Sequence, residues 1–386
     1  MTLLTNLFAY QPFKALYVFG AVFLNLSKLP LWILKYAFIR QHPTWSFRQA
    51  LMLRVTKAFI STVSVIRMHT PLPLTPGKEG ERFIVIKKRD SDATKFKGPM
   101  LANASTVQPV DIGATWYPKP LTAAEATSDV RVILHIHGGA YVIGDGRTEA
   151  TGYLANSLAK HTPATHILSP QYRLSTLPAG PHSNPFPAAL QDALTSYLYL
   201  LHELHIPASQ IVLSGDSAGA NCAIALLRYI VEYGAELDIP HPSSALLWSP
   251  WVNPTDADIS YVYTNAHYAT DYIVPSFTSW GVCAFAGQNP PLEGPSRIAS
   301  NPYANAKLKG FKTPVPLFVN VGGAEVLYYD NQEWVAMMRK EGNEVELDVT
   351  EGVCHDLFMV AGLVGMEGAA REMAKNAGEW LKRVGK

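Results

Sequence analysis

The sequence has little of what marks several protein classes. Its 386 residues include only three cysteines, and none of them lies in a C-x-x-C pair. An odd and sparse set excludes a disulfide framework and indicates reduced thiols. Lysine and arginine together number 32 against 31 acidic residues, which gives a formal net charge of +1. A basic face for nucleic acid is therefore not expected, and we predict no nucleic-acid partner.

Motifs for cofactors and metals are also lacking. The chain carries no glycine-rich loop of the P-loop or dinucleotide type, so we predict no cofactor. His135 and His137 form an H-x-H pair that a strand would place on one face. No third ligand follows at a suitable spacing, and the pattern does not favour a metal site.

Acidic residues are entirely absent from residues 1 to about 70, which are rich in Leu, Phe, Tyr and Trp and are expected to be helical. The uncharged run Ala15–Ser27 is short for a membrane span, which needs about 20 residues. Lys14, Lys28 and Lys35 recur at multiples of seven and lie near one face of a helix, although Pro30 should kink it. Two interpretations stay open: a helix in the membrane interface, and helices that pack on a cap.

From residue 130 onward, apolar strand patterns alternate with helical patterns, which predicts a mainly parallel sheet covered by helices on both faces. The alternation stops between Trp251 and Pro314, in a segment rich in tyrosine and other aromatic residues. We therefore expect N-terminal helices over residues 1–80 and an α/β domain over 81–386, with a cap insertion at about 252–312. A few of the cap aromatics should line an apolar pocket.

The most informative motif is Gly-Asp-Ser-Ala-Gly at 215–219, which follows an apolar strand pattern and precedes a helical one. A serine between two close glycines on a strand-to-helix turn is typical of a nucleophile elbow. The elbow strains the serine backbone, and the flanking glycines let strand and helix approach. Ser217 is the candidate nucleophile, and the amide of Ala218 points at its target.

Two further motifs supply the partners that such a serine needs. The expected strand 132–136 ends in His-Gly-Gly-Ala, where bare amides of Gly138 and Gly139 are predicted to complete an oxyanion hole with Ala218. Glu325 and His355 each follow a later strand pattern, in the chain order Ser, acid, His. Asp330 competes with Glu325 for the acid role, but it is expected to be a first-turn helix charge.

These motifs resemble the hormone-sensitive-lipase-like branch of the α/β-hydrolases, and the likeness spans about residues 130 to 385. The long N-terminal lead is similar to that of fungal members, including steryl-acetate deacetylases and hydrolases of secondary metabolism. Two positions depart from the pattern: Ala140 replaces a glycine after His-Gly-Gly, and Glu325 stands where many relatives carry aspartate. The resemblance implies the α/β-hydrolase fold, with a mostly parallel sheet and a helical cap.

The predicted function is that of a serine hydrolase that cleaves a carboxylic ester of an apolar small molecule through an acyl-enzyme on Ser217. The same residues would serve lactone, amide or thioester hydrolysis, or acyl transfer. A non-catalytic ligand receptor on the same scaffold is the alternative from another class, and the presence of His355 counts against it. We predict a cytoplasmic enzyme, associated with the endoplasmic reticulum membrane if the N-terminal helices bind lipid.

Overall fold

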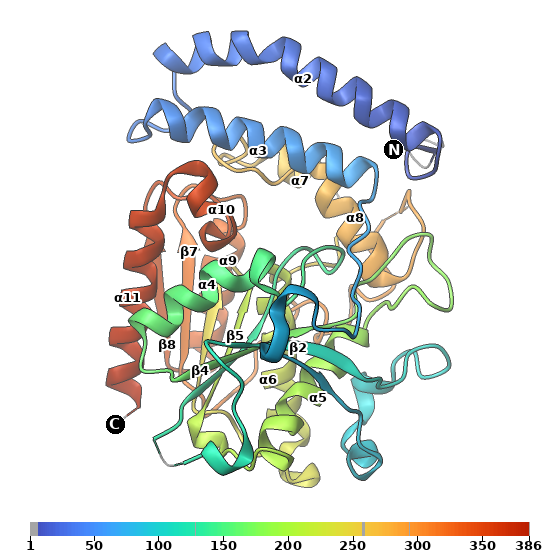
Figure 1. The fold of residues 1–386 in the computed structure, drawn as a ribbon, viewed down its shortest axis with the longest axis vertical. Coiled ribbons are helices and arrows are strands. Elements are labelled where there is room, and N and C mark those ends of the chain that lie inside the picture. The colour runs from blue at the N-terminus through green and yellow to red at the C-terminus, as the bar shows by residue number, and fades with distance from the viewer. Residues whose placement is uncertain (1–6, 128, 257–258, 293, 386) are drawn as a thin grey trace.

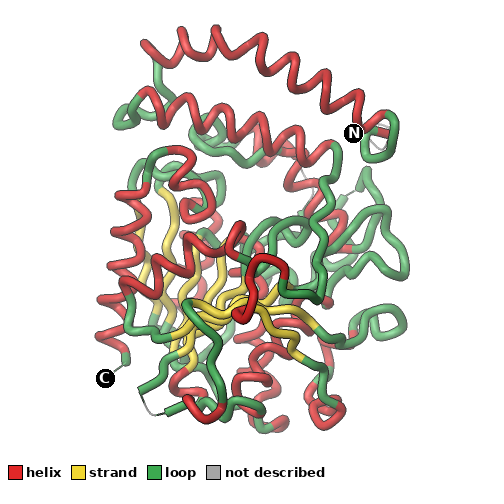
Figure 2. Tube along the Cα trace, viewed as in Figure 1, coloured by secondary structure: helices red, strands yellow, loops and turns green. Residues whose placement is uncertain are grey.

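A single eight-stranded sheet forms the centre of the computed structural model, which describes residues 7–385 except 128, 257–258 and 293. The strands are β1 (Phe83–Ile86), β2 (Ile112–Tyr117), β3 (Val132–Ile136), β4 (His166–Gln171), β5 (Ile211–Asp216), β6 (Ser244–Trp248), β7 (Leu317–Gly322) and β8 (Val345–Thr350). Their order is β1-β2-β4-β3-β5-β6-β7-β8. Strands β3 to β8 pair in parallel, whereas β2 is antiparallel to both of its neighbours. Figure 2 shows the strands at the centre of the molecule and the helices around them.

Helices cover both faces of the sheet, which explains why the parallel strands β3 to β7 are buried over their full length; the edge strand β8 is largely half-buried. Helices α4 (Thr148–His161) and α11 (Glu367–Val384) pack against each other, and α5 (Ala188–His202) packs against α6 (Ser217–Leu237). Helix α9 (Tyr328–Lys340) covers β7 and β8, and the short α10 (Leu357–Val364) precedes α11 (Figure 1). Short 3₁₀ turns occupy Gly77–Arg82, Asp90–Lys95, Gly98–Leu101, Ala123–Glu125 and Ala208–Gln210.

The predicted fold class is confirmed, and the strand positions agree closely with the sequence patterns. One strand starts later than its apolar run: β7 begins at Leu317 and not at Pro314. Proline has no amide hydrogen and cannot donate to a ladder in the middle of a sheet. Pro314 and Pro316 therefore precede the strand.

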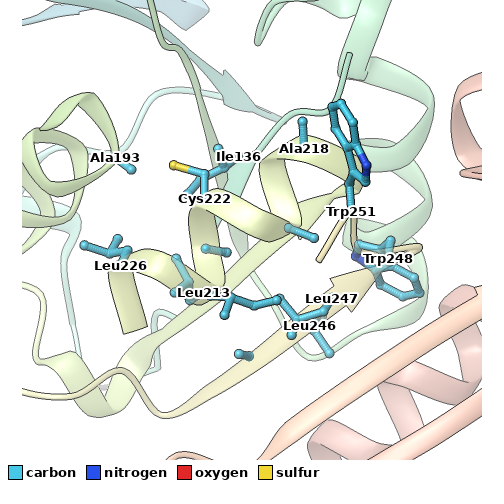
Figure 3. Packing of buried hydrophobic residues seen from close by; sticks show 14 of the residues in the cluster. Ile136, Ala193, Leu213, Ala218, Cys222, Leu226, Leu246, Leu247, Trp248 and Trp251 are labelled. Atoms are coloured by element: carbon cyan, nitrogen blue, oxygen red, sulfur yellow. The ribbon is translucent and has the colours of Figure 1, made fainter. Parts of the chain in front are cut away.

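Buried apolar side chains surround the helix that begins at Ser217. Figure 3 shows side chains of α6 such as Cys222 and Leu226 lying above β5 and β6, where Leu213 and Leu246 face them. All four side chains are almost completely buried. The start of α6 is thus fixed by a rigid apolar layer, and catalytic side chains held on rigid elements are placed precisely.

Two long N-terminal helices lie at one end of the molecule, α2 (Phe13–Phe38) and α3 (Phe47–Val65). Helix α3 packs on the rest of the protein, and α2 lies outside it (Figure 1). Before α3, the Trp45 indole Nε1 donates a hydrogen bond to the Gly352 carbonyl at 2.6 Å. That bond ties the N-terminal helices to the loop after β8, which carries His355.

Helix α2 is one element of 26 residues that includes Pro30. The uncharged run Ala15–Ser27 is therefore only part of a longer helix. An 18-residue window of α2 has a mean hydropathy of 1.5 and is not buried, and by length and composition alone the helix could cross a membrane. A proline removes one hydrogen bond, and the flanking turns continue on either side.

The segment between β6 and β7 contains no strand among its described residues, but it carries α7 (Ile259–Thr264) and α8 (Pro275–Ala286). Helix α3 packs on α8 and also on α10. We propose that α2, α3 and residues 252–312 together form a cap over the carboxyl ends of the parallel strands, and that residues 81–386 form the α/β domain around it.

Candidate active site

The turn from β5 into α6 holds Ser217 in a left-handed backbone conformation, with φ of +50°. A Cβ atom on Gly219 would lie 2.0 Å from the carbonyl oxygen of Ile136, and one on Gly215 would lie 2.4 Å from the carbonyl oxygen of Gly219. Neither position has room for a side chain. The two glycines therefore allow the close approach of strand and helix that the elbow requires.

His355 meets Ser217 across the end of the sheet. Its Nε2 atom lies 2.9 Å from the Ser217 hydroxyl, within hydrogen-bond distance. Ser217 is 7 % exposed and His355 is 2 % exposed, so little water competes for this contact. The Tyr272 ring lies at an edge-to-face angle to the imidazole, 5.9 Å between centroids, and limits how far it can turn.

Glu325 lies on the other side of the imidazole, in the loop after β7. Its Oε1 atom is 3.7 Å from His355 Nδ1, which is an ion-pair distance and longer than a hydrogen bond. Among the described residues, neither of these two buried atoms has another hydrogen-bond partner. They are therefore available to each other, and a small movement of either side chain would close the gap.

The other oxygen of Glu325 is held firmly. Oε2 accepts from the Gly322 amide at 2.8 Å and from the Ser249 hydroxyl at 2.6 Å. Two donors on one oxygen fix the plane of the carboxylate, so Oε1 faces the imidazole. The structure thus brings together Ser217, His355 and Glu325 from three separate loops, as the sequence patterns predicted for their positions.

Ser249 is a part of the site that the sequence analysis did not single out. It follows β6 with φ of +43°, and its hydroxyl oxygen accepts from the Asp356 amide at 3.0 Å while the hydroxyl donates to Glu325. One side chain therefore links the acid loop to the residue after His355. Its signal in the sequence was a Ser-Pro pair at a strand end, which many turns share.

Asp271 is the second residue that the sequence analysis missed. Its carboxylate is fully buried and accepts from the amides of Tyr272 and Val326, at 2.6 and 2.7 Å. Burial raises its pKa above the ordinary value. Val326 directly follows Glu325, so Asp271 joins the segment between β6 and β7 to the loop that holds the acid.

The competing carboxylates have other partners. Asp330 lies in the first turn of α9, as expected, and its Oδ1 is 2.6 Å from Lys307 Nζ. Burial and the neighbouring Asp216 raise the pKa of Asp356 well above its usual range. None of these three carboxyl groups is in position to orient the His355 imidazole as Glu325 does.

One expected oxyanion donor is committed elsewhere. The Gly138 amide, which was expected to face the reacting oxygen, donates to Asp216 Oδ2 at 2.8 Å in this structure. In the part of the chain that the structure describes, the amides of Gly139, Ala140 and Ala218 donate to no protein acceptor. Ala140 has φ of +55° and lines the same cavity as Ser217. The alanine that replaces a glycine at position 140 therefore lines the candidate active site.

The cavity at Ser217 is small and mostly apolar, with a volume of about 20 Å³. Besides Ser217 and His355, its lining residues are Ala140, Trp251, Ile273, Phe277, Thr278 and Leu327. Of the aromatic residues noted between β6 and β7, Phe277 lies here. Tyr272, Trp280 and Phe285 are buried, whereas Tyr261 and Tyr263 are exposed.

The remaining candidate residues have structural contacts. His135 Nδ1 is 3.0 Å from the Ser214 hydroxyl, and the His137 ring stacks on Tyr172 with 4.2 Å between centroids. Burial raises the pKa of the Cys354 thiol well above its ordinary value, which leaves it protonated and unreactive. All three cysteines are free and buried.

Two opposing effects determine the pKa of the His355 imidazole. Burial alone lowers the pKa of an imidazole, because it disfavours the charged form. The carboxylates of Glu325 and Asp271 favour the charged form, and they raise the pKa of His355 to about 9. Only the neutral imidazole can accept the proton of Ser217. In this structure the neutral form is dominant only at alkaline pH.

Comparison with known proteins agrees with this geometry. Residues 133–359 match the profile of a family described as alpha/beta hydrolase fold. An acetyl-hydrolase of Streptomyces hygroscopicus is 30 % identical over 225 residues, which are 58 % of this chain and 67 % of that protein. Steryl acetyl hydrolase 1 of Saccharomyces cerevisiae is 22 % identical over 227 residues, 58 % of this chain and 50 % of the yeast protein.

Solved structures show the same architecture. An esterase from the bacterial hormone-sensitive lipase family superposes with a TM-score of 0.55 at 21 % identity, covering 92 % of this chain and 97 % of its own. At 21 % identity, this structural similarity is evidence for the fold alone.

The opposing effects at His355 predict the pKa of its imidazole. We expect ¹⁵N-histidine NMR to give a pKa above the ordinary 6.5, with the His355 signal assigned by its loss in His355→Gln. Glu325→Gln removes the neighbouring negative charge and should lower this pKa by about one unit or more. Asp330→Asn removes a charge paired with Lys307 and should leave it unchanged. An ordinary pKa that both variants leave unaltered would contradict the electrostatic account.

Proposed function

This chain belongs to the α/β-hydrolase fold family, in its hormone-sensitive-lipase-like branch, and from that premise we propose that Ser217 cleaves carboxylic esters through a covalent acyl-enzyme. Relatives named esterase and acetyl-hydrolase identify the enzyme class as carboxylic ester hydrolase. The observation that carries the residue assignment is the 2.9 Å contact between His355 Nε2 and the Ser217 hydroxyl on a strained elbow.

The proposed reaction has two halves. The Ser217 oxygen attacks the acyl carbonyl carbon while His355 Nε2 takes its proton, and His355 then returns that proton to the departing alcohol. Water attacks the acyl-enzyme in the second half, again with His355 as base, and releases the acid. Glu325 holds the Nδ1 hydrogen and stabilises the charged imidazole during each transfer.

We assign the oxyanion contacts to the amides of Gly139, Ala140 and Ala218, because these three lack protein acceptors. Asp216 supports them indirectly: its bond to the Gly138 amide fixes the loop that presents Gly139 and Ala140. Losing one such donor typically costs about 10²- to 10³-fold in rate.

For the substrate we propose an apolar ester with a short or medium acyl group. The support is the apolar lining of the Ser217 cavity by Trp251, Phe277 and Leu327, together with its small volume of about 20 Å³. Lactone, amide or thioester cleavage and acyl transfer use the same residues. The contact of His355 with Ser217 counts against a receptor without catalysis.

A kinetic test separates the acid from its neighbours. Glu325→Gln should lower kcat by about 10⁴-fold, because the amide can stabilise the wrong tautomer of the imidazole. Asp330→Asn, which removes only a pair with Lys307, should stay near the wild-type rate. The assay uses p-nitrophenyl butyrate, with thermal melts to check folding. Collapse of Asp330→Asn beside a nearly normal Glu325→Gln would move the acid role to Asp330.

The same assay with acetyl to palmitoyl esters tests the substrate class. We expect kcat/KM to fall as the acyl chain lengthens past the medium range. A clear preference for palmitoyl over butyryl esters would contradict the proposed acyl size and leave the acid assignment untouched.

We also propose that α2 attaches the enzyme to a membrane surface. Its outward side chains include Phe19, Phe23 and Phe38, which are 76 %, 68 % and 78 % exposed. Residues 1–78 contain basic but no acidic side chains, which suits an anionic surface. Because α2 packs lengthwise along α3, we infer that it lies in the interface and does not cross it.

Vesicle flotation tests this attachment. The full-length protein should float with vesicles of phosphatidylcholine and phosphatidylserine. Replacing Phe19, Phe23 and Phe38 by serine should weaken binding at least tenfold, since each buried phenylalanine contributes about 1.5–3 kcal/mol. Tyr153→Ser removes an exposed aromatic of α4 and should have no effect. Wild-type protein that remains with the lipid-free fraction would exclude the interfacial interpretation.

A further inference from the structure

A large groove lies away from Ser217, between the two N-terminal helices. Its volume is about 690 Å³, and its walls come from α2, α3 and the segment that leads into α8. The range for sites that hold one small ligand is about 300–1,000 Å³. This groove shares no lining residue with the Ser217 cavity: Val274 lines the groove and Ile273 lines the cavity.

The walls of the groove are apolar along most of their length and carry charge of one sign. Tyr17, Ala21 and Leu24 of α2 line the groove, together with Ala58 of α3 and Val274. The charged groups of the described lining are Lys35, Arg54 and Lys57, with no carboxylate among them. A groove of this composition attracts an anion joined to an apolar body.

Arg54 and Lys35 are the two cations of this lining that donate no side-chain hydrogen bond within the described residues, and Lys35 lies 5.5 Å from the Tyr36 ring centroid. The Arg54 guanidinium stacks over the Trp32 ring at 4.1 Å from the centroid. A guanidinium carries five donors in a planar fork that matches a carboxylate or phosphate. Stacking on Trp32 holds that fork in place without using its donors.

Lys57 differs from Arg54 because its ammonium is already engaged. It donates to the main-chain oxygens of Tyr268 and, at 3.0 Å, of Asp271, and so holds the floor of the groove. Burial lowers the pKa of Lys57 to about 8, with Asp271 acting against this change and the positive charge of Arg54 contributing to it. An anion beside both residues would relieve this repulsion.

We propose that the groove between α2 and α3 binds a single-chain amphiphile with an anionic head, whose head group pairs with Arg54 and whose chain lies along Tyr17, Ala21 and Leu24. A free amphiphile fits better than a bilayer lipid, because α2 itself separates the groove from any surface on which its outer face rests. This site is independent of the esterase reaction, since it contains none of the residues assigned to that reaction.

Equilibrium dialysis of the full-length protein with radiolabelled laurate, kept below its micelle concentration, tests the proposal. We expect saturable binding of one equivalent. Arg54→Gln should weaken it about tenfold or more, because a charge-assisted hydrogen bond is lost. Lys28→Gln makes the same charge change on α2 outside the groove and should bind laurate like the wild type. Dodecanol, which lacks the anion, should bind wild-type protein at least tenfold more weakly than laurate.

A second variant tests the place of binding without touching charge. Ala58 lines the groove, so Ala58→Trp should fill it and abolish laurate binding. Hydrolysis of p-nitrophenyl butyrate reports the folding of each variant and should persist. Laurate binding that survives both Arg54→Gln and Ala58→Trp, or no saturable binding by the wild type, would overturn the proposal. Failure of the esterase assay alone would leave the dialysis result valid.

Discussion

The close approach of α6 to β3 controls the geometry around Ser217. Gly219 lies so near the Ile136 carbonyl that a single methyl group would overlap it, and this contact holds the first turn of α6 against the His-Gly-Gly loop. Because the helix cannot move away, the Ser217 backbone keeps its positive φ and its hydroxyl stays on the side of His355. The free amide of Ala218 is placed by the same contact. The strain is offset by the apolar layer beneath α6, which packs on β5 and β6 (Figure 3).

The buried acids around this elbow have two roles: one lies beside the His355 imidazole, and the others hold a neighbouring loop. Two donors hold one oxygen of Glu325, and its other oxygen faces His355. Burial raises the pKa of both Asp216 and Asp356, and Asp216 holds the Gly138 loop through its bond to the Gly138 amide. Ser249 connects Glu325 to Asp356, since its hydroxyl donates to the Glu325 carboxylate and accepts from the Asp356 amide. Removing its hydroxyl would therefore disturb both sides of the imidazole.

Residues at strand ends could be predicted from the sequence, because the pattern of strand, short turn and helix is local. Ser217, Glu325 and His355 each follow an apolar strand pattern, and parallel strands gather such loops at one edge. The direction of the Gly138 amide could not be predicted, since it depends on a carboxylate 78 residues away. Asp271 and Ser249 were missed for the same reason. Their roles arise from contacts between loops that are distant in the chain and leave no periodic signal.

The central claim is that Ser217 is the nucleophile of an acyl-enzyme, and covalent labelling tests it most directly. The purified protein is treated with a fluorophosphonate, and peptide mapping by mass spectrometry locates the adduct. The account predicts one adduct, on Ser217, with loss of ester hydrolysis in proportion to labelling and with neither label nor hydrolysis in Ser217→Ala. An adduct on a different residue, or ester hydrolysis that persists in Ser217→Ala, would contradict it.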